Sequence, residues 1–249
     1  MKGSAIVTGG SRGIGASTAL LLARAGFAVC VNHRDSAGEA DDVVGAIRNA
    51  GGKACAVAAD VAVDAEVKRL FAEAESKLGR IAVLVNNACY FGRAGRRMED
   101  FDAEMGARVM LVNVVGAMSC AREAIHRMST RRGGRGGRIV NVSSSAAQRG
   151  SPNDWIDYAA SKAAIETFTK GTALEVAEEG IRINAVAAGL TQTDSHARAG
   201  MPDRVAKMSL KVPVGRAAKP EEIAETIVWL AADAPDFMTG AVVPVTGGF

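Results

Sequence analysis

Short apolar runs recur along the chain and alternate with longer segments whose apolar residues follow a helical period. The apolar runs lack the strict alternation of half-exposed strands, which is typical of strands buried on both faces of a sheet. They predict strands at residues 4–8, 28–32, 54–59, 81–87, 138–143, 182–187 and 241–246. The longer segments predict helices near 13–25, from the end of the second strand to 50, near 64–78, within 100–129 and at 155–179. A further helix is expected to begin at Pro220, because proline suits the first helical position.

This alternation predicts parallel strands joined by right-handed helical crossovers. The expected fold is α/β, a doubly wound sheet of about seven parallel strands with helices on both faces. No repeat or linker divides residues 1–249, so a single domain is expected. Residues 191–219 are the longest stretch without predicted regular structure. A loop of that length in a compact domain is usually a lid or disordered, and we expect a substrate lid.

The composition is that of an ordinary globular protein, with 48% hydrophobic and 23% charged residues and a formal net charge of +3. That charge is too small for a general nucleic-acid footprint, so no nucleic-acid partner is expected. The basic run "RRGGRGGR" at 131–138 is a local exception. We interpret it as a solvated loop, with RNA or phosphate binding as the alternative.

The four cysteines, Cys30, Cys55, Cys89 and Cys120, form no C-x-x-C pair and have no neighbouring histidine, so neither a zinc site nor a disulfide framework is predicted. Cys30 and Cys55 fall in apolar runs and are expected to be buried thiols. The N-terminus enters a strand without room for a signal peptide, and no apolar run reaches about 18 residues. We therefore expect no metal, no membrane span and a reducing, cytoplasmic environment.

Two stretches carry candidate chemistry. In "TGGSRGIG", between the first strand and its helix, Gly9 permits a tight turn, and Gly13 and Gly15 let the backbone approach a pyrophosphate at the helix N-terminus. A plain glycine turn is the alternative. In "DYAASKAAIE", Tyr158 and Lys162 stand one helical turn apart, so the ammonium can favour the phenolate and lower the tyrosine pKa. The alternative is an amphipathic helix whose lysine stays in water.

These stretches, with "NNAC", "VNVSSS" and "VAAGLTQT", occur in the order and approximate spacing of the short-chain dehydrogenase/reductase family, which the chain resembles over essentially its full length. The resemblance implies a Rossmann-type fold and hydride transfer between a nicotinamide cofactor and a carbonyl or secondary alcohol. Tyr158 would be the general acid or base, and Lys162 would tune it and bind the nicotinamide ribose. Asn113 and Ser144 would complete the catalytic set.

The resemblance also implies a cofactor site. Asp60 and Val61 would border the adenine, Asn87 and Ala88 the far ribose, and Thr193 would bond the carboxamide. The whole set would be Gly9, Ser11, Arg12, Gly13, Ile14, Gly15, Arg34, Asp60, Val61, Asn87, Ala88, Tyr158, Lys162, Gly189, Thr191 and Thr193.

The end of the second strand decides the expected cofactor. In NAD-using relatives a carboxylate there bonds the ribose 2′-hydroxyl. Alignment places His33 at that position and Arg34 after it. Arg34 and Arg12 can clamp a 2′-phosphate, so NADP(H) is expected. Asp35 keeps NAD(H) as the alternative, because it reaches the ribose if the loop is displaced.

Two site assignments stay open. Ser144 is chosen to hydrogen-bond the reacting oxygen, although Ser145 would restore the commonest spacing to Tyr158, because loops absorb insertions more easily than strand ends. Asn113 matches the asparagine that holds Lys162 through a water, and a buried asparagine that only satisfies backbone groups is the alternative.

Two positions depart from the family pattern. Ala188 stands where proline usually precedes the glycine, which loosens a turn but removes no functional group. Cys89 stands where the pattern has glycine, and its side chain can crowd the cofactor.

The expected function is that of an NADP(H)-dependent oxidoreductase acting on a small carbonyl or alcohol substrate. Within the family, 3-oxoacyl thioester reduction competes with sugar or polyol oxidation, and substrate identity does not follow from the fold. A dinucleotide-sensing regulator without turnover is the non-enzyme alternative. The family also implies a homotetramer built as a dimer of dimers from the helices near 100–129 and 155–179. Ala159, Ala160, Ala163 and Ala164 would allow close helix approach.

Overall fold

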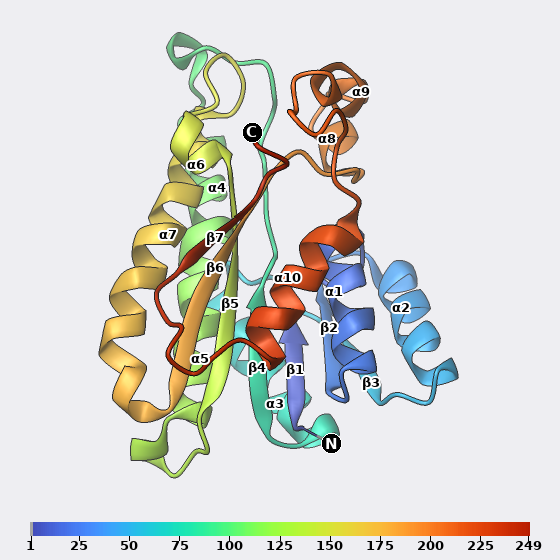
Figure 1. Ribbon diagram of the computed structural model, residues 1–249, viewed down its shortest axis with the longest axis vertical. Helices are drawn as coiled ribbons and strands as arrows, with labels where there is room; N and C mark the ends of the chain where they lie inside the picture. Colours follow the sequence, from blue (N-terminus) through green and yellow to red (C-terminus); the bar gives the residue numbers. More distant parts are fainter. Residues whose placement is uncertain (1) are drawn as a thin grey trace.

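The computed structural model describes residues 2–249, which contain seven strands in one all-parallel sheet (Figure 1). The strands lie in the order β3-β2-β1-β4-β5-β6-β7. Every predicted strand is confirmed, with each end within one residue of its expected position. Their bounds are Ser4–Val7 (β1), Ala28–His33 (β2), Ala54–Ala58 (β3), Ile81–Asn86 (β4), Gly137–Ser144 (β5), Ile181–Ala188 (β6) and Val242–Val245 (β7).

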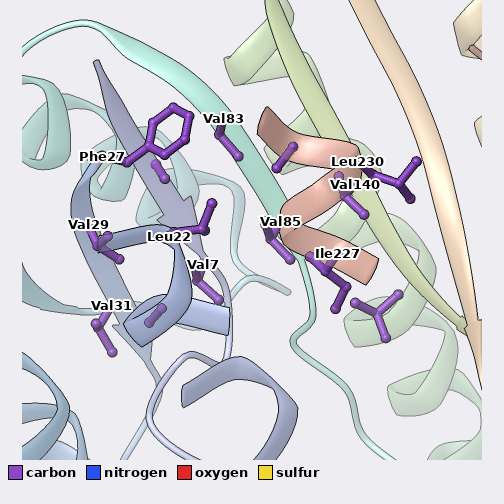
Figure 2. Close-up of a cluster of buried hydrophobic side chains, with 14 of the residues drawn as sticks. Val7, Leu22, Phe27, Val29, Val31, Val83, Val85, Val140, Ile227 and Leu230 are labelled. Carbon is purple, nitrogen blue, oxygen red and sulfur yellow. The ribbon is translucent and has the colours of Figure 1, made fainter. Parts of the chain in front are cut away.

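Helices cover both faces of the sheet, as the alternating pattern predicts (Figure 1). One face carries α1 (Gly13–Arg24), α2 (Ala37–Asn49) and α10 (Pro220–Ala232), and the other carries α3 (Asp64–Leu78), α5 (Ala117–Met128) and α7 (Ile156–Val176). Figure 2 shows the first face, where Leu22, Ile227 and Leu230 pack with valines of β1, β2, β4 and β5. Burying each such side chain stabilises the fold by about 1.5–3 kcal/mol.

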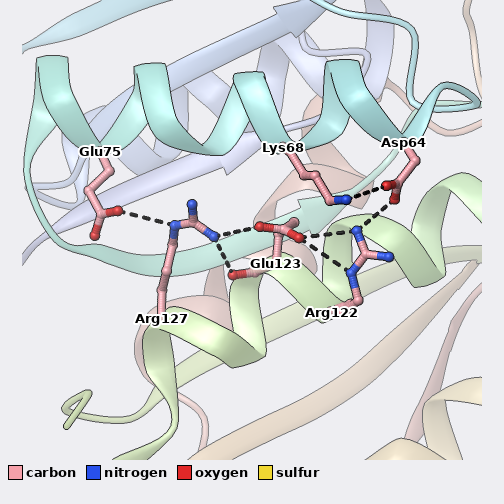
Figure 3. Close-up of polar contacts among 6 residues, drawn as sticks. All are labelled: Asp64, Lys68, Glu75, Arg122, Glu123 and Arg127. Carbon is pink, nitrogen blue, oxygen red and sulfur yellow. Dashed lines mark hydrogen bonds and ion pairs between the residues drawn. The ribbon is translucent and has the colours of Figure 1, made fainter. Parts of the chain in front are cut away.

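Charged side chains join α3 to α5 on the opposite face (Figure 3). Glu123 lies between Arg122 and Arg127, which reach Asp64 and Glu75 of α3 at 2.6 and 3.1 Å. Burial would raise the pKa of Glu123, but the two guanidinium groups outweigh it and hold that pKa below its usual range. Exposed ion pairs contribute little. Glu123 is mostly buried, however, and needs both arginines, so the network fixes the position of α5 against α3.

The long helix predicted within 100–129 begins later and is not uniform. A 3₁₀ turn at Met98–Asp100 precedes α4 (Ala103–Met110), which continues through a π-helical segment at Leu111–Gly116 into α5. Single wide turns of this kind are rare and are frequent at functional sites. This one contains Asn113, which is 2% exposed.

The prediction that residues 191–219 lack regular structure is wrong. This segment contains α8 (Ser195–Arg198) and α9 (Arg204–Ser209), and an isolated parallel bridge joins Thr191 to Ala218 at its base. The two helices have only four and six residues. That length is too short for a helical period to stand out in the sequence.

Other expectations from composition are also resolved. Cys30 and Cys55 are buried thiols as predicted, and they face each other across the β2–β3 ladder. The basic run is mostly exposed, as predicted, and Arg131 pairs with Glu178 at 3.0 Å. Between residues 2 and 249, no helix is both long and apolar enough to span a bilayer.

Candidate active site

A cleft of about 500 Å³ opens at the carboxyl ends of the strands. β1 and β4 are neighbours in the sheet but not in the chain, so the strand order reverses between them. In open parallel sheets, ligands bind at this switch point. Residues after β1, β2, β3, β4, β5 and β6 all line the cleft, together with α7 and the segment that carries α8 and α9.

The glycine turn between β1 and α1 requires glycine for two reasons. Gly9 and Gly13 have φ angles of 60° and 51°, which other residues adopt only with strain, and both line the cleft. Gly15 lies behind the turn. A Cβ there would stand 2.3 Å from the Gly9 carbonyl oxygen and 2.5 Å from Asn87 Nδ2. Gly15 thus lets α1 approach the end of β4, whereas Ser11, Arg12 and Ile14 lie on the cleft wall with Gly9 and Gly13.

Thr8 fixes the end of β4 against this turn. Its Oγ1 accepts hydrogen bonds from the backbone N–H groups of Asn87 and Ala88 at 2.9 and 3.0 Å. Asn87 Nδ2 in return donates to the carbonyl oxygens of Thr8 and Gly9 at 2.9 and 3.0 Å. Asn87 and Ala88 are therefore held on the cleft wall by contacts that use both their backbone and the Asn87 side chain.

Asp60 and Val61 line the cleft after β3. The Asp60 carboxylate pairs with Arg108 and accepts a hydrogen bond from the Ala62 N–H at 2.9 Å. Burial would raise the pKa of Asp60, but these two contacts outweigh it and keep that pKa below its usual range. The carboxylate is therefore ionised and fixed in orientation.

Two arginines border the same end of the cleft, and each already has a carboxylate partner. Arg12 Nη1 lies 2.7 Å from Glu39 Oε1, and Arg34 donates to Asp35 from Nη2 at 2.6 Å and from Nε at 3.1 Å. The hydrogen bonds between Arg34 and Asp35 lower the pKa of the carboxyl and raise that of the guanidinium. Exposed pairs of this kind contribute little to stability because water screens them, so a bound phosphate can replace either partner.

Tyr158 and Lys162 both face the cleft from α7 and are 7% and 4% exposed. The Lys162 ammonium lies 5.6 Å from the centre of the Tyr158 ring and donates to the Val142 carbonyl oxygen at 2.7 Å. The alternative in which Lys162 stays in water is therefore wrong. The Ser144 side chain, at the end of β5, faces the same cleft and is near enough to the phenol to lower its pKa, while Ser144 Oγ accepts a hydrogen bond from the Ala146 N–H at 3.1 Å. Ser145 also lines the cleft but has no such effect on the phenol.

The expected lowering of the tyrosine pKa is not found in the protein alone. Burial raises the pKa of Tyr158 well above its usual value, and the nearby Ser144 hydroxyl offsets only part of this rise. The physical reason is that the Lys162 ammonium is directed at the Val142 carbonyl rather than at the phenol. The phenol is neutral in this state and retains its proton.

Asn113 makes the contacts of the alternative interpretation, a buried amide that satisfies backbone groups. Its Oδ1 accepts from the Tyr90 N–H at 2.7 Å, and its Nδ2 donates to the Tyr90 carbonyl and to Ser161 Oγ, both at 3.0 Å. It thereby fixes the loop after β4 to α7, behind the cleft wall. Burial raises the pKa of the Cys89 thiol, and the nearby Lys162 and Asn113 side chains offset part of that rise.

The turn after β6 tolerates the missing proline. Ala188 pairs with Ser144 on one side and with Val245 on the other, so the ladder itself holds the end of the strand. Gly189 follows, where a Cβ would stand 2.7 Å from Thr246 Cα. Gly189, Thr191 and Thr193 line the cleft, and Thr193 Cγ2 lies 3.0 Å from where a Gly13 Cβ would be, so Thr193 faces the glycine turn.

Known proteins share this architecture over nearly the whole chain. The sequence profile of a family described as Enoyl-(Acyl carrier protein) reductase matches residues 9–249. A solved structure of a Serratia marcescens short-chain dehydrogenase/reductase variant superposes with a TM-score of 0.89 at 32% identity, covering 99% of this chain and 97% of that one. The chain belongs to the short-chain dehydrogenase/reductase family.

Three curated relatives of this short-chain dehydrogenase/reductase are similar over 98% of its chain. It is 44% identical to the oxidoreductase YgfF of Escherichia coli (98% of that protein covered). It is 40% identical to cis-4-hydroxycyclohexanecarboxylate dehydrogenase of Sinomonas cyclohexanicum (95% covered). It is 39% identical to 3-oxoacyl-[acyl-carrier-protein] reductase of Synechocystis (95% covered). The protein is therefore an oxidoreductase of alcohol or carbonyl substrates that uses a nicotinamide dinucleotide.

An aromatic wall of this reductase was not detectable from the motifs. Phe91 stacks on Tyr158 with ring centroids 4.5 Å apart and planes at 17°. Trp155 meets Phe91 edge-on at 5.7 Å, and His196 of α8 lies 6.0 Å from Phe91 and 5.9 Å from Trp155. These residues belong to three separate segments. The one hint in the sequence is the position of Trp155 directly before the tyrosine motif.

α9 is fastened to this wall by charge. Arg204 pairs with Asp154, and its guanidinium lies 4.4 Å from the centre of the Trp155 ring. The two paired side chains are 16% and 15% exposed, so the pair is largely shielded from water. Burial, reinforced by Arg204, lowers the pKa of His196 to about 4, and the imidazole is neutral at neutral pH. The segment 191–219 thus closes one side of the cleft.

Proposed function

We propose that the protein is an NADP(H)-dependent oxidoreductase that transfers a hydride between the nicotinamide and a carbonyl or secondary-alcohol substrate. The observation that carries the proposal is the arrangement of Ser144, Tyr158 and Lys162 on the wall of the same cleft that contains the glycine turn. A dinucleotide-sensing protein needs the glycine turn, but it has no use for a phenol, a hydroxyl and an ammonium grouped beside an apolar wall.

The residues present fit a dinucleotide. The N-terminus of α1 opens on the cleft, and its first turn contains no acidic side chain, so its free N–H groups suit a pyrophosphate. Ser11, Gly13 and Ile14 would bind there, and Asp60 and Val61 would border the adenine. Thr191 and Thr193 would contact the nicotinamide end. The bound cofactor supplies the hydride donor or acceptor at its nicotinamide C4.

NADP(H) rather than NAD(H) is proposed because Arg12 and Arg34 both line the cleft at the end of β2. Guanidinium groups bind phosphate oxygens in a forked geometry. The 2′-phosphate would take over the hydrogen bonds that these arginines make with Glu39 and Asp35. Because those pairs are exposed, breaking them costs little.

Proton transfer is assigned to Tyr158. In the direction of reduction, the neutral phenol donates its proton to the carbonyl oxygen as the hydride reaches the carbonyl carbon. In oxidation, the phenolate removes the hydroxyl proton and becomes the neutral phenol. Ser144 holds the reacting oxygen beside the phenol. Lys162 would leave the Val142 carbonyl for the ribose hydroxyls, where its charge favours the phenolate and lowers the pKa that burial raises. Asn113 keeps this wall in place through Tyr90.

The test is a turnover screen with NADPH and NADH against ketones, 3-oxoacyl thioesters and sugars. The relatives named above act on a hydroxycyclohexanecarboxylate and on a 3-oxoacyl carrier protein, so both substrate classes belong in the screen. Turnover that depends on NADPH supports the proposal. Tight NADPH binding with no turnover of any member would favour the sensor.

A homotetramer is also proposed. Leu111, Val115 and Met118 form an exposed apolar stripe along the helix from α4 to α5, each 40–46% exposed, which a second copy can bury. Of the four alanines expected at the α7 contact, Ala159 is buried within the chain at 3% exposure and faces the interior. Ala160, Ala163 and Ala164 remain available. A monomeric mass by light scattering at micromolar concentration would contradict the tetramer.

We further propose that residues 191–219 act as a lid and that the enzyme works in the reducing cytoplasm, where its four thiols stay unpaired. The contacts of His196 and Arg204 with the aromatic wall support the lid, because they join it to the side chains around the reacting centre. Protection of this segment from hydrogen exchange should increase when cofactor binds.

A further inference from the structure

One arginine on the cleft wall has no carboxylate partner among residues 2–249. Five arginines line the cleft, and four of them approach a carboxylate within 4.0 Å. Arg149 forms no ion pair and no side-chain hydrogen bond with any residue from 2 to 249. The four paired arginines are Arg12 and Arg198 with Glu39, Arg34 with Asp35, and Arg204 with Asp154.

Arg149 belongs to the substrate end of the cleft. It ends α6 (Ala146–Arg149), the short helix that follows Ser144. Its guanidinium lies 3.6 Å from the centre of the Phe249 ring, a stacked position in which the N–H donors around the edge of the plane remain free. Arg149 is exposed to the cleft, and partial burial together with the positive charge of Arg204 lowers its pKa, so the nearby field favours an anion beside the two arginines.

None of the acidic side chains on the cleft wall pairs with Arg149. Asp35, Asp60 and Asp194 are the three carboxylates that line it. Asp35 and Asp60 follow β2 and β3, and both are paired with arginine. Asp194 precedes α8 in the segment that closes the cleft and forms no ion pair with Arg149. Among the described residues, no side-chain carboxylate therefore neutralises Arg149.

We propose that Arg149 binds the carboxylate of an anionic substrate whose carbonyl or alcohol group reacts at Tyr158. This inference rests on the proposed function and assigns its substrate class. The same cleft is lined by Phe91 and Trp155 beside Tyr158 and by Met208 of α9, which suit an apolar ring or chain. A sugar would instead require hydrogen-bonding groups along its length, and these three side chains offer mostly apolar surface. The substrate is accordingly an oxo or hydroxy acid with an apolar body.

Charge-neutral analogues test the assignment by turnover. With NADPH, the wild type should reduce 4-oxocyclohexanecarboxylate with a higher kcat/KM than its methyl ester or cyclohexanone. Arg149→Gln should lower kcat/KM for the acid about tenfold, because a partly exposed, charge-assisted hydrogen bond to the carboxylate is lost. The loss should appear mostly in KM, because this hydrogen bond is equally strong in the substrate complex and in the transition state. Cyclohexanone should be unaffected, and Arg149→Lys should recover part of the loss. Arg97→Gln, which removes an exposed guanidinium outside the cleft that pairs with Glu99, is the matched control.

Binding provides a readout that does not depend on turnover. Calorimetry with the NADP⁺-loaded protein should show cyclohexanecarboxylate binding more tightly than cyclohexanecarboxamide, and Arg149→Gln should remove that difference. Equal binding of acid and amide to the wild type would overturn the proposal. If Arg149→Gln impairs a phosphate-bearing acyl thioester but not the oxo acid, the carboxylate assignment is overturned as well. Selective acid binding without turnover of any ketone would refute the proposed oxidoreductase function and leave the anion site standing.

Discussion

Tyr158→Phe isolates the proposed proton transfer because it removes one oxygen and leaves the ring. The ring is stacked on Phe91 at 4.5 Å and is 7% exposed, so its packing persists. The loss of one hydroxyl group with no hydrogen bond of its own to residues 2–249 should change the free energy of unfolding by only about 1 kcal/mol. General acid–base catalysis contributes about 10²–10⁴-fold, which at about 1.36 kcal/mol per tenfold is roughly 2.7–5.4 kcal/mol of barrier.

The assay compares kcat with NADPH affinity. Tyr158→Phe should lose at least about 100-fold in kcat while its NADPH dissociation constant stays near that of the wild type. The chain has one other tyrosine, Tyr90, which also lines the cleft, and Tyr90→Phe is therefore the matched control. Tyr90→Phe should retain kcat within about twofold, because Tyr90 contributes to the site through its backbone N–H and carbonyl groups, which hydrogen-bond Asn113. Wild-type turnover by Tyr158→Phe, on a substrate established for the native enzyme, would refute the assigned mechanism.

Lys162→Met extends the same test to the pKa of the phenol. Removing the ammonium removes the charge that favours the phenolate in the complex, while burial continues to raise the pKa of Tyr158. The pH optimum of alcohol oxidation should therefore move upward, and cofactor affinity should fall because a ribose contact is lost. An unchanged pH profile would contradict the role given to Lys162.

Three further perturbations check other parts of the site. Arg34→Asp should shift the cofactor preference from NADPH toward NADH, measured as the ratio of the two dissociation constants. A wild-type protein that binds NADH more tightly than NADPH would contradict the argument from Arg12 and Arg34. Gly15→Ala should lower the free energy of unfolding by about 1–3 kcal/mol, because its Cβ would stand 2.3 Å from the Gly9 oxygen. The control Gly45→Ala, in open space within α2, should raise the free energy of unfolding by about 0.5–1 kcal/mol. Equal effects of the two substitutions in denaturant melts would refute the packing account. The pKa of His196 is about 4 in the folded protein against its ordinary 6.5, so its stabilising contribution is complete above pH 6.5 and is lost as pH falls toward 4. Hydrogen exchange in residues 195–209, corrected for the intrinsic rate, should therefore be faster at pH 5 than at pH 7.5. His196→Phe should remove that difference.

Much of the fold was determined by local sequence. Each strand is an uninterrupted apolar run because both faces of the sheet are covered, and that pattern is visible without knowing what covers it. The glycine turn was equally readable, since the positive φ angles of Gly9 and Gly13 are demands of the backbone at those two positions. Tyr158, Lys162 and Ser144 were predictable as site residues from motif and spacing, and their meeting in one cleft follows from the parallel sheet.

Tertiary structure decided what these side chains contact. Lys162 donates to the Val142 carbonyl, and Asn113 bonds the backbone of Tyr90, because the packing of α7 against β5 and the π-helical segment set those distances. The helices in residues 191–219 escaped prediction because each is shorter than two helical turns.

The aromatic wall and the absence of a carboxylate partner for Arg149 in the described chain were the features least predictable from the sequence. Phe91, Trp155 and His196 come from three segments and meet only after the chain has folded. Whether an arginine lacks a partner depends on where every carboxylate of the chain is placed, which is a property of the whole molecule. Sequence patterns encode burial and backbone conformation locally, whereas complementary charge in a cleft arises from contacts between residues distant along the chain.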